Sequence, residues 1–394
     1  MNIAEFLYLR GAEPSSVVAE VAATIGLADE DALLAVGSLV EGLGTSKSDL
    51  DLLLITSRGD GLNSVQDSAT LIVGSCIADL RIMRTVELEE LLNRLDYWSR
   101  LPWEVTHAVR FTLEERTLMH RLLQGQVLHR DKRNRVGEHM PSLVDLARLK
   151  LHVARQISRT IQVDMAGYRE TGDYASLVFA AQDLLGHAVD ALLAGYHITN
   201  PLIKWRSRLL DLVPSNWERF LTVQPTGLTA SQQVWRLHRA PETPDSKLAL
   251  EHAERITAFA RAVFVWAELR LVKAAVVNER PAIRNPLKRK ATDLPLPSLD
   301  FDVDFLLAEE KVTIARLNEF GVSLELSPRE FALILLFDGI TTRREAELIA
   351  YGTHRGKAPS DVIDHLLSTV TGAGLTADAK DESRRSSSRR GHRE

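Results

Sequence analysis

The pattern of hydrophobic and polar positions changes character twice along the chain. Residues 14–26 carry apolar side chains at helical spacing after a Pro-Ser-Ser start and end at a glycine, which predicts a short helix. Short aliphatic runs follow, separated by clusters of Gly, Ser, Asn and Asp; they are residues 32–40, 49–56, 69–75 and 76–84. Such runs between turn-forming residues predict a small mixed β-sheet.

From Thr85 onward the pattern becomes helical. Apolar residues recur three and four positions apart in long stretches, namely residues 86–95, 113–125, 143–162, 174–196, 204–213 and 254–277. This spacing places the apolar side chains on one face of a helix. The change of period predicts a first domain over residues 1–110 and a helical domain over residues 111–284.

A second change falls at Asn285-Pro286. Residues 285–303 combine three prolines with a basic cluster and lack an apolar period, which predicts a linker. Residues 304–378 are expected to form a short hairpin and about three helices, because Ser327-Pro328-Arg329-Glu330 has the sequence of a capping box. The Ser/Arg-rich residues 379–394 predict a disordered tail. The expected fold class is α+β: a small mixed-sheet domain, an α-helical domain and a small winged-helix-like domain.

Composition and charge argue against several classes of protein. The chain of 394 residues is longer than one core usually organises, and its 45% hydrophobic and 26% charged residues are typical of a soluble protein. No apolar run approaches the length that spans a bilayer, the first residues do not resemble a secretory signal, and Cys76 is the single cysteine. We therefore expect a cytoplasmic protein without a membrane partner. The net charge of −5 argues against nucleic acid as a partner.

Two acidic residues interrupt the second aliphatic run. Asp49 and Asp51 alternate with leucines, so in a strand their carboxylates point to the same face. Like charges that close repel each other unless a cation lies between them. Carboxylate oxygens suit Mg²⁺, which keeps positions for water and phosphate. The pair therefore predicts a magnesium site.

The residues ahead of this pair indicate a phosphate ligand. One Gly-Ser dipeptide ends the preceding run, and a Ser-Lys-Ser turn leads back to the aspartates. Small residues let backbone N–H groups and hydroxyls approach an anion. We expect phosphate beside the metal, held by Gly37, Ser38, Ser46, Lys47 and Ser48.

The order of these residues resembles the DNA polymerase β-like nucleotidyltransferase superfamily, over residues 1–110. The shared features are Gly37-Ser38, then Ser48-Asp49-Leu50-Asp51, then a later aspartate between apolar residues. The resemblance implies that the Gly-Ser turn holds nucleotide phosphates and that the alternating acids bind two Mg²⁺ ions. It also implies a third acid on a neighbouring strand, which shares in metal binding and helps to activate the acceptor.

The third acid is assigned to Asp79. It lies between two apolar residues in the last aliphatic run, whereas the weaker candidate, Asp67, lies in a polar stretch. Period-2 alternation places Arg81 on the same face as Asp79, where it could steady the carboxylate of Asp79 or bind a phosphate of the nucleotide. The expected catalytic and metal-binding residues are therefore Asp49, Asp51 and Asp79.

The helical part resembles aminoglycoside-modifying enzymes and related small-molecule nucleotidyltransferases, in which helices close the cleft and hold the acceptor. Lys204-Trp205-Arg206 is a candidate contact for phosphate or base, because a cation and a flat ring adjoin there. The alternative is a solvated cation beside a core tryptophan.

The C-terminal part resembles the winged-helix peptide-recognition domains of ribosomal-peptide biosynthesis. Phe337-Asp338-Gly339 and Thr341-Thr342 carry this likeness. Peptide or protein docking, nucleic-acid binding and a purely structural role are all open for this part.

Together these features predict a Mg²⁺-dependent nucleotidyltransferase. It would move a nucleoside monophosphate, with ATP as the expected donor, to a hydroxyl of a small molecule or peptide and release pyrophosphate. The alternatives are transfer to a protein, an RNA end or a second nucleotide, and a catalytically decayed regulatory protein that docks a partner.

Overall fold

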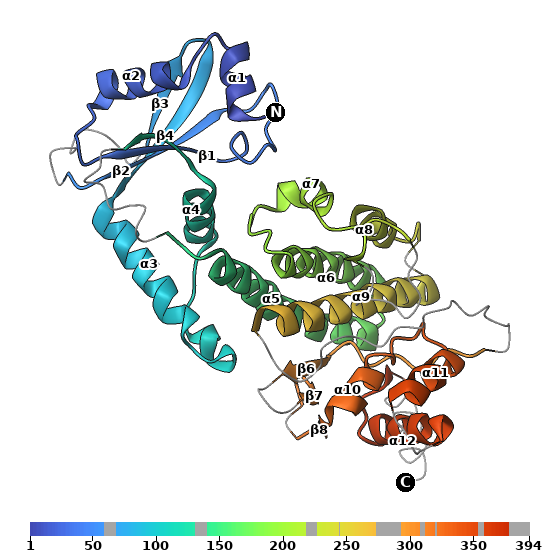
Figure 1. The fold of residues 1–394 in the computed structure, drawn as a ribbon. Coiled ribbons are helices and arrows are strands. Elements are labelled where there is room, and N and C mark those ends of the chain that lie inside the picture. Colours follow the sequence, from blue (N-terminus) through green and yellow to red (C-terminus); the bar gives the residue numbers. More distant parts are fainter. Residues whose placement is uncertain are drawn as a thin grey trace. The chain divides into compact units, whose positions relative to one another are not determined.

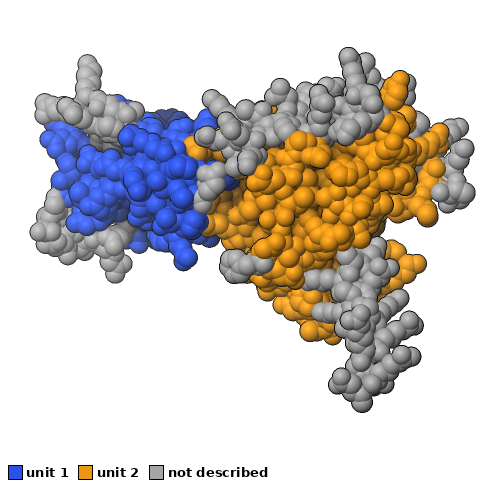
Figure 2. Space-filling view, turned by 90° about the horizontal axis from the view of Figure 1, so that it is seen from below, with its two compact units in different colours: residues 1–146, 199–208 blue, residues 147–198, 209–394 orange. Residues whose placement is uncertain are grey.

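The chain divides into two compact units (Figure 2). The computed structural model describes residues 1–58, 68–130, 140–217, 227–243, 245–272, 293–307, 312–319, 321–353 and 358–377. Unit 1 comprises Met1–Leu146 and Thr199–Arg208, and unit 2 comprises Ala147–Ile198 and Leu209–Glu394. The expected α+β class with a small mixed sheet is confirmed. Asp67 and the tail at residues 379–394 lie outside the described residues.

Unit 1 is built around a five-stranded sheet with the strand order β3-β4-β2-β1-β5 (Figure 1). Its strands are β1 (Ala32–Val36), β2 (Leu50–Thr56), β3 (Ser68–Val73), β4 (Cys76–Arg84) and β5 (Gln126–Arg130). β2 and β4 are parallel, and the other neighbouring pairs are antiparallel. The runs predicted as strands therefore belong to one mixed sheet. The polar sequence of β5 gave no signal for a further edge strand.

The two faces of this sheet differ in chemistry. Helices α1 (Ile3–Leu9) and α2 (Pro14–Ile25) cover one face (Figure 1), where Phe6, Val21 and Leu52 belong to one buried apolar core. Because side chains alternate along a strand, the neighbours of the buried leucines in β2 point to the opposite face. That opposite face carries the predicted aspartates.

Helix α4 (Leu113–Gln124) lies against this second face (Figure 1). Its start is fixed by a capping box, in which Thr112 and Glu115 each accept the other's backbone N–H. Its end packs so closely on β1 that a Cβ atom added at Gly125 would lie 2.9 Å from the side chain of Leu34. Unit 1 also contains α3 (Thr85–Ser99), η2 (Trp103–Ala108), η3 (Ile203–Trp205) and the start of α7 (Arg206–Leu210).

Long helices form the first part of unit 2. They are α5 (Leu143–Thr171, whose first turn lies in unit 1), α6 (Tyr174–Gly195), α8 (Ala230–His238) and α9 (Ser246–Val272). α6 and α9 approach so closely that a Cβ atom added at Gly195 would lie 2.1 Å from the ring of Trp266. The helical middle of the chain therefore agrees with the predicted period.

Among the described helices, α6 is long and apolar enough to cross a membrane. However, 56% of its most apolar window is buried within the structure, as in the core helix of a soluble protein. Length and composition alone are weak evidence for a span, so the cytoplasmic location stays a prediction.

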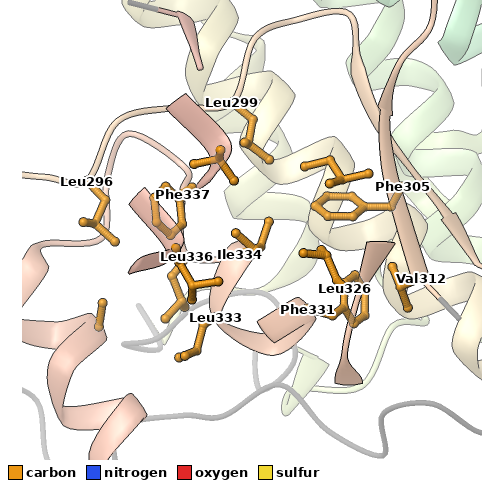
Figure 3. Close-up of a cluster of buried hydrophobic side chains, with 14 of the residues drawn as sticks. Leu296, Leu299, Phe305, Val312, Leu326, Phe331, Leu333, Ile334, Leu336 and Phe337 are labelled. Atoms are coloured by element: carbon orange, nitrogen blue, oxygen red, sulfur yellow. The ribbon is translucent and has the colours of Figure 1, made fainter. Parts of the chain in front are cut away.

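The C-terminal part of unit 2 combines a three-stranded antiparallel sheet with short helices (Figure 1). The elements are β6 (Val303–Leu307), β7 (Val312–Arg316), β8 (Ser323–Leu326), α10 (Pro328–Ile334), α11 (Arg343–Thr353) and α12 (Pro359–Gly372). Phe305 and Phe331 pack edge to face in its apolar core, to which Phe337 also belongs (Figure 3). The capping box at Ser327 is confirmed. The expected hairpin gains a third strand, β6, which begins at the predicted linker's last residue.

The described part of the predicted linker at 285–303 is packed rather than extended. Leu296, Leu299 and Phe301 are buried in the apolar core of unit 2 (Figure 3 labels Leu296 and Leu299). Asp300 and Asp304 are also buried, and arginines that are distant in sequence compensate their charges: Arg169 and Arg316 pair with Asp300, and Arg155 and Arg159 with Asp304. The composition of residues 285–303 predicted a linker, because the arginines that pair with these aspartates are distant in the sequence.

Candidate functional site: a carboxylate pair on the unit 1 sheet

Strand pairing places Asp51 and Asp79 next to each other. In the parallel pair of β2 and β4, residue 51 is the register partner of residue 79. Neighbouring strands lie about 4.8 Å apart, and register partners point to the same face of the sheet. The side chain of Asp51 is 29% exposed, whereas Asp79 is exposed to solvent. The structure therefore brings together two of the three predicted acids.

Asp49 lies at the rim of this pair. It directly precedes β2 and is exposed. The paired register of β2 and β4 begins at Leu50, so it does not place Asp49 beside Asp79. Asp79 is oriented by its cross-strand neighbour Thr70, whose hydroxyl donates a hydrogen bond of 3.3 Å to Asp79 Oδ1.

The backbone at Gly37 touches the carboxylate of Asp51. Gly37 follows β1, has φ +79°, and leaves so little room that a Cβ atom there would lie 2.3 Å from Asp51 Oδ2. The turn that begins here closes on itself, because the carbonyl of Gly37 accepts the N–H of Glu41 and that of Ser38 accepts the N–H groups of Leu43 and Gly44. Glycine is therefore required at this position for both conformation and space.

Arg121 is a site residue that the sequence analysis missed. Its Nη2 atom lies 3.0 Å from Asp51 Oδ1. Burial raises the pKa of Asp51, Arg121 and Lys204 oppose this shift, and Asp79 adds to it. The predicted residue Lys204 is thus electrostatically coupled to Asp51, and the site contains two acids and two bases.

Helix α4 reaches two points of the polar sheet face. Glu114 in its first turn lies 2.8 Å from the guanidinium of Arg81, and Arg121, seven residues later, pairs with Asp51. Residues seven apart lie on the same face of a helix, two turns from each other. Arg81 is therefore engaged by a carboxylate of α4. In the sequence, the indication of this contact was a pair of opposite charges, Glu114 and Arg121, seven positions apart in the predicted helix at residues 113–125.

The turn at Ser46, Lys47 and Ser48 is closed by its own hydrogen bonds. Ser48 Oγ accepts the N–H of Thr45 at 2.9 Å, and the carbonyl of Ser46 accepts a hydrogen bond of 2.8 Å from Arg10. Within the part of the chain that the structure describes, none of these three predicted phosphate contacts has a hydrogen bond or ion pair with the aspartates. Ser38 differs from them, because it lies in the turn that touches Asp51.

Lys204 lies in the segment Thr199–Arg208, which returns to unit 1. Its side chain is exposed, with Nζ 5.1 Å from the centre of the Trp205 ring, and the guanidinium of Arg208 lies 5.7 Å from the same ring. Cations near an aromatic face are attracted by its quadrupole. The predicted Lys204-Trp205 motif is therefore a basic cluster in the same unit as the carboxylate pair.

The donor set at Asp51 and Asp79 suits a hard divalent cation. Among the described residues, no group of three His, Cys, Asp or Glu side chains is close enough to form a complete protein-only site. Mg²⁺ is commonly held by one or two carboxylates, with water and phosphate completing its shell. A pair of carboxylates beside a tight glycine turn meets that requirement.

Comparison with known proteins adds no relative. No protein-family model matches the chain, and no curated protein matches it at a significant level.

Proposed function

We propose that this protein is a Mg²⁺-dependent nucleotidyltransferase that acts through the carboxylate pair of unit 1. The observation that supports it is the side-by-side register of Asp51 and Asp79, with the Gly37 backbone against Asp51. A buried hydrophobic strand does not need this arrangement. Repulsion between the two acids is relieved when a cation lies between them.

In this proposal Asp51 and Asp79 hold Mg²⁺, with Asp49 at the rim. The bound metal would polarise the α-phosphate of the nucleotide and lower the pKa of the acceptor hydroxyl. The N–H groups of the Gly37-Ser38 turn and the ammonium of Lys204 would hold the triphosphate, because the turn touches Asp51 and the charge of Lys204 acts on the same carboxyl.

Arg121 would change partner during this reaction. In the described structure it neutralises Asp51. When metal and nucleotide occupy the site, its guanidinium can pair with phosphate oxygens instead, since a guanidinium binds carboxylate and phosphate with similar forked geometry. Arg121 would thus orient the nucleotide and keep the empty carboxylate pair from carrying two unbalanced charges.

The acceptor is proposed to be a hydroxyl of a small molecule or a peptide. An open groove of about 720 Å³ in unit 2, whose lining includes Pro295, Ser298, Asp364 and Thr371, is a candidate place for a docked peptide. Binding of fluorescent basic and acidic peptides would test this role.

Label transfer from α-labelled NTPs tests the proposal directly. The wild-type protein with Mg²⁺ and an acceptor mixture should form labelled product and release pyrophosphate, whereas Asp51→Ala and Asp79→Ala should form none. Asp31→Asn is the matched control: it breaks a buried ion pair with Arg58 at the other end of β1 and should leave transfer intact.

The same assay separates the alternative functions. Product formed from NTPs alone would indicate a second nucleotide as acceptor, and label on the protein or on added RNA would indicate those acceptors. A decayed regulatory protein would bind no NTP in the presence of Mg²⁺. Transfer that survives both aspartate substitutions would refute the proposed site.

A further inference from the structure

The chain returns to unit 1 for one short segment. It leaves this unit after Leu146, forms most of α5 and all of α6 in unit 2, and comes back for Thr199–Arg208 only. This return brings Lys204 to the unit that carries Asp51. The contacts that hold the segment there therefore decide where Lys204 lies.

Glu41 and His120 join the segment to the glycine turn. Glu41 belongs to the turn that starts at Gly37, and its Oε2 atom accepts a hydrogen bond of 2.8 Å from Asn200. His120 lies between the two parts: Nδ1 is 2.9 Å from Thr199 Oγ1, and Nε2 is 3.0 Å from Glu41 Oε2 without the geometry of a hydrogen bond. His120, Thr199 and Asn200 are each at most 5% exposed. Water therefore has little access to these polar contacts, which strengthens them.

Two further bonds extend this connection toward Lys204. The side-chain oxygen of Asn200 accepts the N–H of Leu202 at 2.9 Å, immediately before the short helix η3 that contains Lys204. Arg208 donates to the carbonyl of Leu43, in the same turn as Glu41. Hydrogen bonds thus join the turn that begins at Gly37 to the segment Thr199–Arg208 both before and after Lys204.

From these contacts we infer that Glu41, His120 and Thr199 are positioning residues, which hold the Gly37-Ser38 turn and Lys204 in one arrangement for the phosphates of the NTP. The inference rests on the proposed function. Helix α4 links the two parts of the site, because its neighbouring residues His120 and Arg121 reach the polar cluster and Asp51, respectively. None of the three positioning residues needs to touch the nucleotide.

A double-mutant cycle on the KM for NTP tests this role. Glu41→Ala and Lys204→Met should each raise KM roughly tenfold, the size expected when a charge-assisted contact is lost. Because Glu41 holds Lys204 as well as the turn, part of its effect passes through Lys204, so the double variant should raise KM by clearly less than the product of the two single effects. Effects that multiply to roughly a hundredfold would show that the two residues are independent, and would overturn the inference.

Conservative variants separate positioning from general stability. Glu41→Gln keeps an oxygen for Asn200 and should restore most of the affinity, whereas Thr199→Val, which is nearly the same size, should raise KM with kcat nearly unchanged. Asp31→Asn also breaks a buried ion pair of unit 1 and should leave KM unchanged. A KM increase in Asp31→Asn equal to that in Thr199→Val would contradict the positioning role.

Hydrogen exchange without nucleotide tests the same contacts. Amides of residues 199–208 should exchange at least several-fold faster in Glu41→Ala and Thr199→Val than in the wild type, and unchanged exchange would overturn the inference. If the wild type binds no NTP with Mg²⁺, the proposed function fails and the phosphate role with it. If the wild type binds NTP and the positioning variants bind equally well, only this inference fails.

Discussion

Gly37 and Asp51 constrain each other at the residue scale. The carboxylate occupies the space that a side chain at position 37 would need. Gly42 lies in the same turn with nearly the same φ, +72°, but no heavy atom lies within 4 Å of a Cβ atom added there. The pair of glycines therefore separates the effect of backbone strain from the effect of displacing Asp51.

We predict that Gly37→Ala weakens Mg²⁺-dependent NTP binding at least tenfold, while Gly42→Ala does not. Both substitutions place alanine at a positive φ, which should lower the free energy of unfolding by roughly 1–2 kcal/mol in each, and displacement of Asp51 adds to this cost in Gly37→Ala alone. Calorimetric titration and urea unfolding measure the two effects. Equal loss of NTP affinity in both variants would refute a special role for Gly37.

The second residue-scale prediction concerns Arg121. Burial raises the pKa of Asp51, and Arg121 opposes this shift. Arg121→Gln should therefore raise the pKa of Asp51 further, so that Asp51 binds its proton at a higher pH and Mn²⁺ binding begins to weaken at a higher pH. Mn²⁺ titrations between pH 4 and 8 measure the profile.

Arg116→Gln is the control for this prediction. It removes the same charge from α4, at a side chain that donates to the carbonyl of Thr112. Its Mn²⁺ profile should match that of the wild type. A wild-type profile in Arg121→Gln would show that Arg121 does not govern the titration of Asp51.

At this scale the sequence predicted Asp51 and Asp79 but not Arg121, which pairs with Asp51. Alternation along the strand predicted the face of Asp51, and the resemblance to the nucleotidyltransferase superfamily selected Asp79, whereas the parallel register of β2 and β4 that brings the two together is a tertiary contact. Arg121 lies 70 positions from Asp51 in the sequence. Its role depends on how α4 packs on the sheet, which tertiary contacts decide.

At the element scale, β6 joins unit 2 through buried charges. Asp304 in this strand lies 2.8 Å from Arg155 and 2.9 Å from Arg159, both on α5. Burial alone would raise the pKa of Asp304, but these arginines lower it below its ordinary value. Arg261 of α9 adds hydrogen bonds to backbone carbonyls of residues 299–303. Paired charges thus hold the segment that composition alone described as a linker.

We predict an acid-dependent stability from this network. A carboxyl with a lowered pKa stabilises the fold fully above its unfolded pKa, near 3.8, and loses this contribution as the pH falls through the folded value. Asp304→Asn should cost about 3–5 kcal/mol at neutral pH, because it leaves buried arginines without their charge partner, and should flatten the loss of stability below about pH 4.

Urea unfolding at pH 3 to 7 measures this prediction. Asp364→Asn serves as the control, since Asp364 forms an exposed pair with Arg343 and should give the wild-type curve. The network has no role in acid stability if Asp304→Asn keeps the wild-type pH dependence.

At the scale of the whole molecule, the chain divides in a way that composition did not reveal. The periodicity of the sequence predicted one helical domain over residues 111–284. The contacts in the structure instead assign Thr199–Arg208 to unit 1 and place α4 on the sheet of that unit. The polar contacts of His120, Thr199 and Asn200 explain the return of this segment. Sequence periodicity finds helices, but it carries no information about which unit a connecting segment joins.

The central claim is that Asp51 and Asp79 form a metal and nucleotide site, and titration with a nonhydrolysable NTP tests it most directly. Asp51→Asn should remain folded, because burial already disfavours the charged carboxylate. The wild type should bind the NTP only when Mg²⁺ is present, and Asp51→Asn and Asp79→Asn should each weaken binding at least tenfold. Absence of Mg²⁺-dependent binding by the wild type, or binding by both variants as tight as that of the wild type, would contradict the claim.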